Sequence, residues 1–167
     1  MIAQTDPTKL FYIDEAGIQE YIYREYAKAK KGIRVIGKIS GKRYVRTSII
    51  SARNNNHKFI APFIFNGMTD TELVLFWVKE VLLPALPVNS ILVWDNAAFH
   101  KSEKLRELIE KNSHTMLFLP PYSPDLNPIE HKWQELKQRL RSYYDESVDF
   151  FENLIRQVNY MSSLDIG

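Results

Sequence analysis

The chain has 167 residues, of which 45% are hydrophobic and 25% charged, with a net charge of +2 at pH 7, and these values fit one globular domain and exclude a disordered chain. Cysteine is absent, which excludes disulfides and thiolate metal sites and leaves carboxylates and histidines as the strong metal ligands. The sequence has no uncharged apolar run of about 18 residues and no signal-peptide pattern, so we expect an intracellular protein without a membrane segment.

The first half of the chain is predicted to form mainly antiparallel strands. Residues 10–14 form a short apolar run that ends in an acid, Asp14, and predict a first strand. Residues 34–39 and 43–52 predict a hairpin, and residues 58–65 predict a further strand before a turn.

A basic segment, residues 24–46, lies between the first strand and the next. It holds nine Lys or Arg and a single acid, Glu25. One interpretation is a solvated basic face. The other is a phosphate-contacting surface, because tyrosines interleave the charges as in proteins that follow a nucleic-acid backbone. The candidate DNA-contacting residues here are Lys28, Lys30, Lys31, Arg34, Lys42 and Arg43.

The second half alternates helices and strands. Thr69 and Glu72 have the spacing of a capping box, which predicts a helix that begins at Thr69 and ends at Pro84. Residues 90–95 form an uninterrupted apolar run ending in Asp95, which is typical of a buried central strand. A helix over residues 102–112 follows.

The last strand is predicted over residues 114–120, and two helices complete the chain. Asn127 is expected to cap the first of them, with Pro128 in the first helical position. Its apolar stripe consists of Ile129, Trp133, Leu136 and Leu140. The final helix is expected to bury Phe151, Leu154, Ile155 and Val158. Strands followed by alternating strand and helix predict an α/β domain with a mixed sheet and helices on its faces.

Three carboxylates are candidate metal ligands. Asp14 and Asp95 each follow an apolar strand, where a rigid element can hold a ligand, although an aspartate there can also cap a turn. Glu130 lies in the first turn of a predicted helix, where it can stay ionised for a cation or bond back to the N–H of Asn127. Three oxygen ligands favour Mg²⁺ or Mn²⁺, and a pair of such ions can promote in-line displacement at a phosphodiester.

A second stripe on the same predicted helix begins with Glu130. It continues through Gln134 to Lys137 and Arg141 at helical spacing. Because the stripe becomes basic, Lys137 and Arg141 are candidate contacts to a phosphate backbone.

Three segments carry a family resemblance: FYIDEAG, LVWDNAAFH and LPPYSPDLNPIEHKW. Together they resemble the DDE transposases of bacterial insertion sequences in the mariner-like superfamily, over roughly residues 10–143. The resemblance implies a ribonuclease H-like fold with a mixed five-stranded sheet and helices on both faces. It also implies that Asp14, Asp95 and Glu130 are the catalytic acids of metal-dependent DNA cleavage and strand transfer at transposon ends, in the bacterial cytosol and near the nucleoid.

The motifs contain further polar residues with open roles. Asn96 and His100 are expected to orient ligands, contact DNA or form buried hydrogen bonds. His131 is expected to pack in the core or contact phosphate. Glu15 follows Asp14 in a strand and therefore points to the opposite face, so we do not expect it to bind metal.

The organisation of the chain departs from the family in one respect. Members usually carry helix-turn-helix modules ahead of the core, whereas thirteen residues precede Asp14 here. We therefore expect a single catalytic domain over residues 1–167, working as a homodimer on DNA, with a separately encoded helix-turn-helix half as a candidate partner. By the same likeness residues 18–33 contact a partner subunit or DNA. The alternatives are a catalytically inactive DNA-binding remnant and another ribonuclease H-like nuclease.

Overall fold

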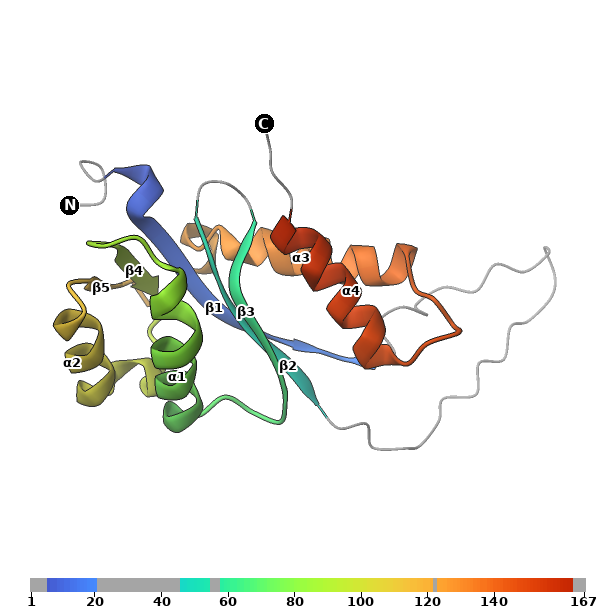
Figure 1. The fold of residues 1–167 in the computed structure, drawn as a ribbon, viewed down its shortest axis with the longest axis horizontal. Coiled ribbons are helices and arrows are strands. Elements are labelled where there is room, and N and C mark those ends of the chain that lie inside the picture. The colour runs from blue at the N-terminus through green and yellow to red at the C-terminus, as the bar shows by residue number, and fades with distance from the viewer. Residues whose placement is uncertain (1–5, 21–45, 55–57, 122, 164–167) are drawn as a thin grey trace.

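The computed structural model describes residues 6–20, 46–54, 58–121 and 123–163. Within these residues, five strands form one sheet in the order β3-β2-β1-β4-β5 (Figure 1). The strands are β1 (Leu10–Ile18), β2 (Thr47–Arg53), β3 (Phe59–Asn66), β4 (Ile91–Trp94) and β5 (Thr115–Phe118). The central strand, β1, is antiparallel to β2 and parallel to β4, and β5 is parallel to β4. The predicted mixed five-stranded sheet is confirmed.

The first strand is longer than the sequence pattern predicted. It runs on past Asp14 to Ile18, so Asp14 lies inside β1 and not at its end. The added residues have backbone partners on β2, because Asp14 lies opposite Ser51 and Ile18 lies opposite Thr47. Asp95, in contrast, directly follows β4 as expected.

The predicted hairpin between residues 34–39 and 43–52 lies largely outside the described residues, which include neither residues 34–39 nor the turn. The described part of its second strand belongs to β2, which lies between β1 and β3 in the sheet.

Four α-helices occur in the described residues: α1 (Thr71–Trp77), α2 (Glu103–Lys111), α3 (Ile129–Ser142) and α4 (Phe150–Ser163). The helix that begins with α1 continues as a π turn over Val78–Leu82 and a 3₁₀ turn over Leu83–Ala85. Its cap is Asp70 and not Thr69, because Asp70 Oδ1 accepts a hydrogen bond from the N–H of Leu73 at 2.8 Å. No helix in these parts of the chain is long and apolar enough to cross a membrane.

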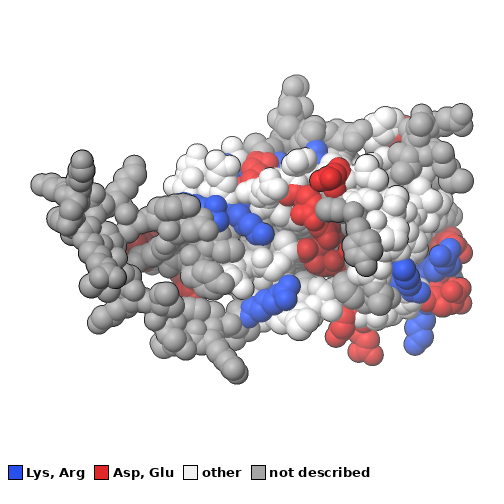
Figure 2. All heavy atoms as spheres, turned by 180° about the vertical axis from the view of Figure 1, so that it is seen from behind, with Lys and Arg blue, Asp and Glu red and all other residues white. Residues whose placement is uncertain are grey.

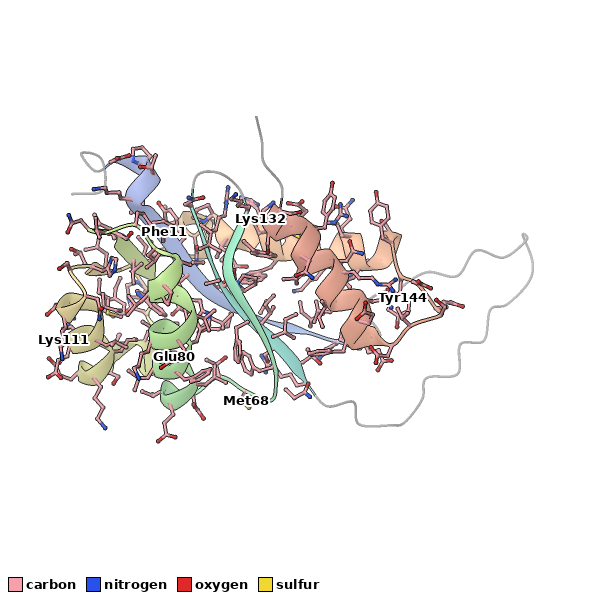
Figure 3. The ribbon with its side chains drawn as sticks, in the orientation of Figure 1. Phe11, Met68, Glu80, Lys111, Lys132 and Tyr144 are labelled. Atoms are coloured by element: carbon pink, nitrogen blue, oxygen red, sulfur yellow. The ribbon has the colours of Figure 1, made fainter. Side chains whose placement is uncertain are left out.

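The helices cover both faces of the sheet, as predicted. Ile13 of β1 packs in one cluster with Trp77 of α1 and Ile109 of α2. Ile18, on the other face of β1, packs with residues of α3 and α4. Figure 1 shows α1 and α2 grouped at one end of the molecule and α3 and α4 at the other. Side chains fill the space between these layers, including that of Phe11 (Figure 3).

The apolar stripe predicted for α3 is buried in full, since Ile129, Trp133, Leu136 and Leu140 all belong to the core. In α4, Leu154 and Val158 are buried, but Phe151 is 40% exposed. Phe150 packs against the core in its place. The buried face of α4 therefore includes positions 150, 154 and 158. It begins with Phe150, one residue before the predicted Phe151.

Candidate active site

Two of the three candidate acids come from neighbouring parallel strands. The pairing of β1 with β4 joins Phe11 to Leu92 and Tyr12 to Val93. Continued by two residues, this register places Asp14 level with Asp95. The recorded pairing ends at Tyr12 and Val93, so each acid comes two residues after the last paired position of two neighbouring strands.

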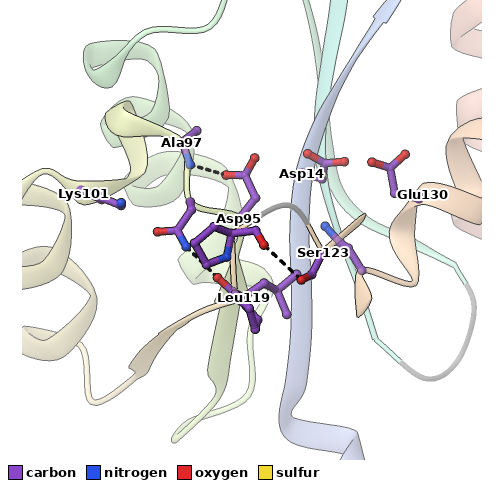
Figure 4. Close-up of a pocket in the computed structure, with 11 residues that line it drawn as sticks. Asp14, Asp95, Ala97, Lys101, Leu119, Ser123 and Glu130 are labelled. Atoms are coloured by element: carbon purple, nitrogen blue, oxygen red, sulfur yellow. Dashed lines mark hydrogen bonds between the residues drawn. The ribbon is translucent and has the colours of Figure 1, made fainter. Parts of the chain in front are cut away.

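The third acid reaches the same place from α3. A pocket of about 450 Å³ is lined by Asp14, Asp95 and Glu130, together with Asn96, Lys101 and Asn127. Figure 4 shows Asp14 on β1 and Glu130 on α3 extending toward the same space, with Asp95 on the other side of Asp14. The structure thus brings the three predicted acids to one pocket. Among the described residues, no three His, Asp or Glu side chains form a preformed metal-binding group.

Asp14 is the most buried of the three acids, with 9% of its surface exposed. Its Oδ2 accepts a hydrogen bond from Nε1 of Trp133 at 3.0 Å. Burial is the main cause that raises the pKa of Asp14 to about 7, and the negative charges of Glu15 and Glu130 raise it further. Negative charge is therefore crowded at this position.

Asp95 is more exposed and is held by two donors. Its Oδ1 accepts hydrogen bonds from the N–H of Ala97 at 2.9 Å and from Nδ1 of His100 at 2.6 Å. The hydrogen bond from His100 is the main cause that lowers the pKa of Asp95. The lowered pKa favours the ionised form of Asp95, whereas the raised pKa of Asp14 favours its protonated form.

His100 is completely buried and lies between two carboxylates. While Nδ1 faces Asp95, Nε2 lies 2.8 Å from Oε1 of Glu15. Burial opposes a positive charge on the ring, but the hydrogen bonds to Asp95 and Glu15 outweigh it and raise the pKa of His100 to about 9. Ionised carboxylates only accept hydrogen bonds, so both ring nitrogens are donors.

The other two supporting residues of the motifs lie in different environments. The side-chain amide of Asn96 donates to the carbonyl of Leu119 at 2.8 Å and so ties the loop after β4 to the end of β5. His131 is exposed on α3, so its predicted packing in the core is wrong and phosphate contact stays a prediction.

The start of α3 differs by one residue from the prediction. Pro128 occupies the cap position and Ile129 is the first helical residue, so Glu130 is the second and not the third. Asn127 is buried, and its Oδ1 accepts a long hydrogen bond of 3.4 Å from the N–H of Ile129. No described residue donates a hydrogen bond to the Glu130 carboxylate, so the capping-box bond to Asn127 is absent there. The start of α3 is held instead by Arg53 of β2, whose Nη1 donates a hydrogen bond to the carbonyl of Pro128.

Sequence patterns missed four residues of this site. Arg53, Trp133 and Glu15 act through contacts to residues at least 75 positions away, which no local pattern reports. Lys101 lines the pocket as its only lysine or arginine among the described residues. Its place directly after the LVWDNAAFH motif is the one signal that could have indicated it.

The candidate DNA-contacting residues are only partly within the described residues. Lys137 and Arg141 lie on α3, half-buried and exposed respectively. On the face turned away from Figure 1, acidic side chains gather near the middle, and separate lysines and arginines lie beside them (Figure 2). Six further candidates lie outside the described residues: Lys28, Lys30, Lys31, Arg34, Lys42 and Arg43.

Comparison with known proteins identifies the family. The model of the DDE superfamily endonuclease matches residues 9–155, which include all three acids. The chain belongs to the DDE superfamily endonucleases. Its ribonuclease H-like sheet with helices is the fold of transposase and integrase catalytic cores.

The curated relatives of this DDE domain include transposases. It is 46% identical over 46 residues to the Tc1 transposase of Caenorhabditis elegans, covering 28% of this chain and 17% of that protein. Its fold matches the Mos1 strand transfer complex with a TM-score of 0.72 at 18% identity, covering 95% of this chain and 48% of that one. It also matches the Mos1 transposase catalytic domain solved with raltegravir and Mn, with a TM-score of 0.67 at 15% identity, covering 98% and 75%. The chain spans less than half the length of the curated relatives that it matches.

Proposed function

We propose that this DDE domain is the catalytic domain of a transposase, which cleaves DNA at transposon ends and transfers the strand to target DNA. One observation carries the proposal: Asp14, Asp95 and Glu130, from three separate segments, line one pocket in a chain that matches the family model. Three carboxylates in one open pocket fit phosphodiester chemistry with divalent metal ions.

The proposed cofactors are Mg²⁺ or Mn²⁺, in a pair, held by Asp14, Asp95 and Glu130. The donor set fits, since it consists of hard oxygen ligands and the chain has no cysteine. Burial raises the pKa of Asp14, the charges of Glu15 and Glu130 raise it further, and a bound cation would favour the ionised carboxylate. Bound divalent ions would supply Lewis acidity for in-line displacement at phosphorus.

The chain's own residues prepare the three acids in different ways. Trp133 fixes Asp14, and Ala97 and His100 fix Asp95, whereas Glu130 has no hydrogen-bond donor among the described residues. Two acids are therefore fixed before metal arrives, and the third can adjust its rotamer.

The proposed substrate is DNA, and the proposed assembly is a homodimer on the transposon ends, over residues 1–167 as one catalytic domain. Lys137 and Arg141 follow Glu130 along α3, and Lys101 lines the pocket, which supports the proposal that these side chains contact backbone phosphates. A helix-turn-helix partner, separately encoded, would supply recognition of the transposon ends.

The test is Mn²⁺-dependent nicking and strand transfer by the chain, joined to a helix-turn-helix half, on DNA that carries the element's own ends. We expect activity for the wild-type protein, its loss in Asp95→Asn, and no change in Glu110→Gln, which alters an exposed acid of α2. Full activity of Asp95→Asn would refute the mechanism. Preference for an RNA–DNA hybrid would identify another ribonuclease H-like nuclease. Salt-sensitive DNA binding without turnover would identify an inactive remnant.

A further inference from the structure

A buried bridge of three side chains connects two strands of the sheet behind the pocket. His100 lies between Asp95 Oδ1, at 2.6 Å, and Glu15 Oε1, at 2.8 Å. The ring of Trp94 packs against His100 with the ring centroids 4.7 Å apart. His100 is fully buried and the Glu15 side chain is 12% exposed, so water does not compete freely for the bond between them, whereas the Asp95 side chain is 45% exposed.

The bridge restricts the orientation of the Asp95 carboxylate. Oδ1 is engaged by two donors, Nδ1 of His100 and the N–H of Ala97, which belong to the 3₁₀ turn after β4. With Oδ1 held at two points, the carboxylate cannot rotate without breaking a hydrogen bond, and Oδ2 is left for a ligand in the pocket. Asp95 itself follows the end of β4, where the ladder with β1 no longer holds it, so this restraint is not duplicated by the sheet.

Glu15 connects His100, and through it Asp95, to β1. It follows Asp14 directly, and successive residues of a strand point to opposite faces. Asp14 therefore reaches Trp133 on the α3 side, while Glu15 reaches His100 on the side of α1 and α2. Two consecutive residues of one strand thus contact both of the other segments that carry the catalytic acids.

We propose that Glu15 and His100 are positioning residues that hold the Asp95 carboxylate in the orientation needed to bind a divalent metal ion. The inference rests on the proposed function, because it takes Asp95 as a metal ligand. Groups that hydrogen-bond a metal ligand from behind typically change metal affinity by about 10–100-fold when they are replaced.

Two substitutions of His100 separate its two bonds. An asparagine amide can place its N–H₂ near the position of Nδ1, and a glutamine amide can reach the position of Nε2. His100→Asn therefore keeps a donor for Asp95, whereas His100→Gln keeps a donor for Glu15 and leaves Asp95 Oδ1 with Ala97 alone. A purely structural role for the ring predicts no such order between the two variants.

The experiment measures Mn²⁺ binding by the metal-free full chain, from the loss of the free Mn²⁺ signal in electron paramagnetic resonance. We expect His100→Gln to weaken Mn²⁺ binding by about 10-fold or more, and His100→Asn to weaken it less. Glu15→Ala is expected to weaken binding because it leaves Nε2 of His100 without its acceptor. Glu15→Gln retains an acceptor oxygen and is expected to restore part of the affinity.

The control is Val158→Ala, which removes volume from the core between the sheet and α4, away from the bridge. Melting temperatures of all variants are measured without metal. Equal loss of Mn²⁺ affinity in Val158→Ala and His100→Gln would overturn the proposal, since it would indicate general loosening of the fold.

The outcomes separate this inference from the proposed function. If Asp14→Asn abolishes Mn²⁺ binding but both His100 variants and Glu15→Ala bind as the wild type does, the positioning role is wrong and the metal site stands. If the wild type binds no Mn²⁺ that depends on Asp14, the proposed function fails, and the positioning role fails with it.

Discussion

The Asp14→Asn variant is expected to be more stable than the wild type at pH 8 in the absence of metal. Asp14 is buried near Glu15 and Glu130, and its pKa is raised from 3.8 to about 7. At pH 8 the Asp14 carboxylate is therefore ionised in both the folded and the unfolded chain, but its charge is unfavourable only in the folded chain, where it is buried. Asparagine removes that charge while retaining an oxygen that can accept the hydrogen bond from Trp133.

The magnitude follows from the difference between the folded and unfolded pKa. A shift of about three pH units at roughly 1.36 kcal/mol per unit gives at most about 4 kcal/mol. The buried amide N–H₂ of asparagine, if unpaired, costs about 1–3 kcal/mol. We therefore expect a net gain in the free energy of unfolding of about 2 kcal/mol at pH 8.

The sign of the effect depends on pH. Above pH 7 Asp14 is ionised in both states, and the full cost of the buried charge is present. Between pH 7 and 3.8 the folded state holds the proton more tightly, so the cost falls as the pH falls, and it vanishes below 3.8. Near pH 4 only the cost of the amide remains, and Asp14→Asn is expected to be less stable than the wild type.

The assay is urea denaturation of both proteins with a chelator at pH 8 and at pH 4. Asp95→Asn is the matched control, because the pKa of Asp95 is lowered, chiefly by the hydrogen bond from His100. Its charge stabilises the fold above its ordinary pKa, so removal of that charge is expected to destabilise the protein at pH 8. A stability difference between Asp14→Asn and the wild type that is the same at both pH values would refute the reasoning.

Two further substitutions test local contacts by urea denaturation. Asp70→Ala is expected to lower the free energy of unfolding by about 1 kcal/mol, because it removes the cap of α1. Thr69→Ala is the control and is expected to have little effect. Equal losses in the two variants would contradict the assignment of Asp70 as the cap. Trp133→Phe is expected to cost about 1.5–3 kcal/mol at pH 8, because the ionised carboxylate of Asp14 loses its donor. A cost that disappears in the Asp14→Ala background, where the acceptor is missing, would assign it to this bond.

The sequence predicted the parts of the fold that depend on local periodicity. The apolar stripe of α3 and the apolar run of β4 were enough to place Asp95 and Glu130 at the boundaries of buried elements. The three motifs predicted which acids would meet, and the structure brings them to one pocket.

Other features were beyond local patterns because they depend on long-range contacts. The extension of β1 past Asp14 requires β2 as a partner, and the start of α3 is held by Arg53 from a different part of the sheet. The same holds for Glu15, whose opposite orientation was predicted but whose partner, 85 residues away, was not. A capping rule placed α3 one residue early because it considered only adjacent residues.

The position of β1 between β2 and β4 has a consequence for how errors in folding would affect the site. A slip of β1 by one residue against either neighbour would exchange the faces of Asp14 and Glu15. Glu15 would then point toward Trp133 and Asp14 toward His100. The pocket would contain a glutamate in place of an aspartate, and the buried histidine would face the shorter aspartate. Since β1 is paired along both edges, such a slip must break two ladders of backbone hydrogen bonds at once. The pairing of β1 on both edges therefore keeps Asp14, and not the longer Glu15, on the face of the sheet that lines the pocket.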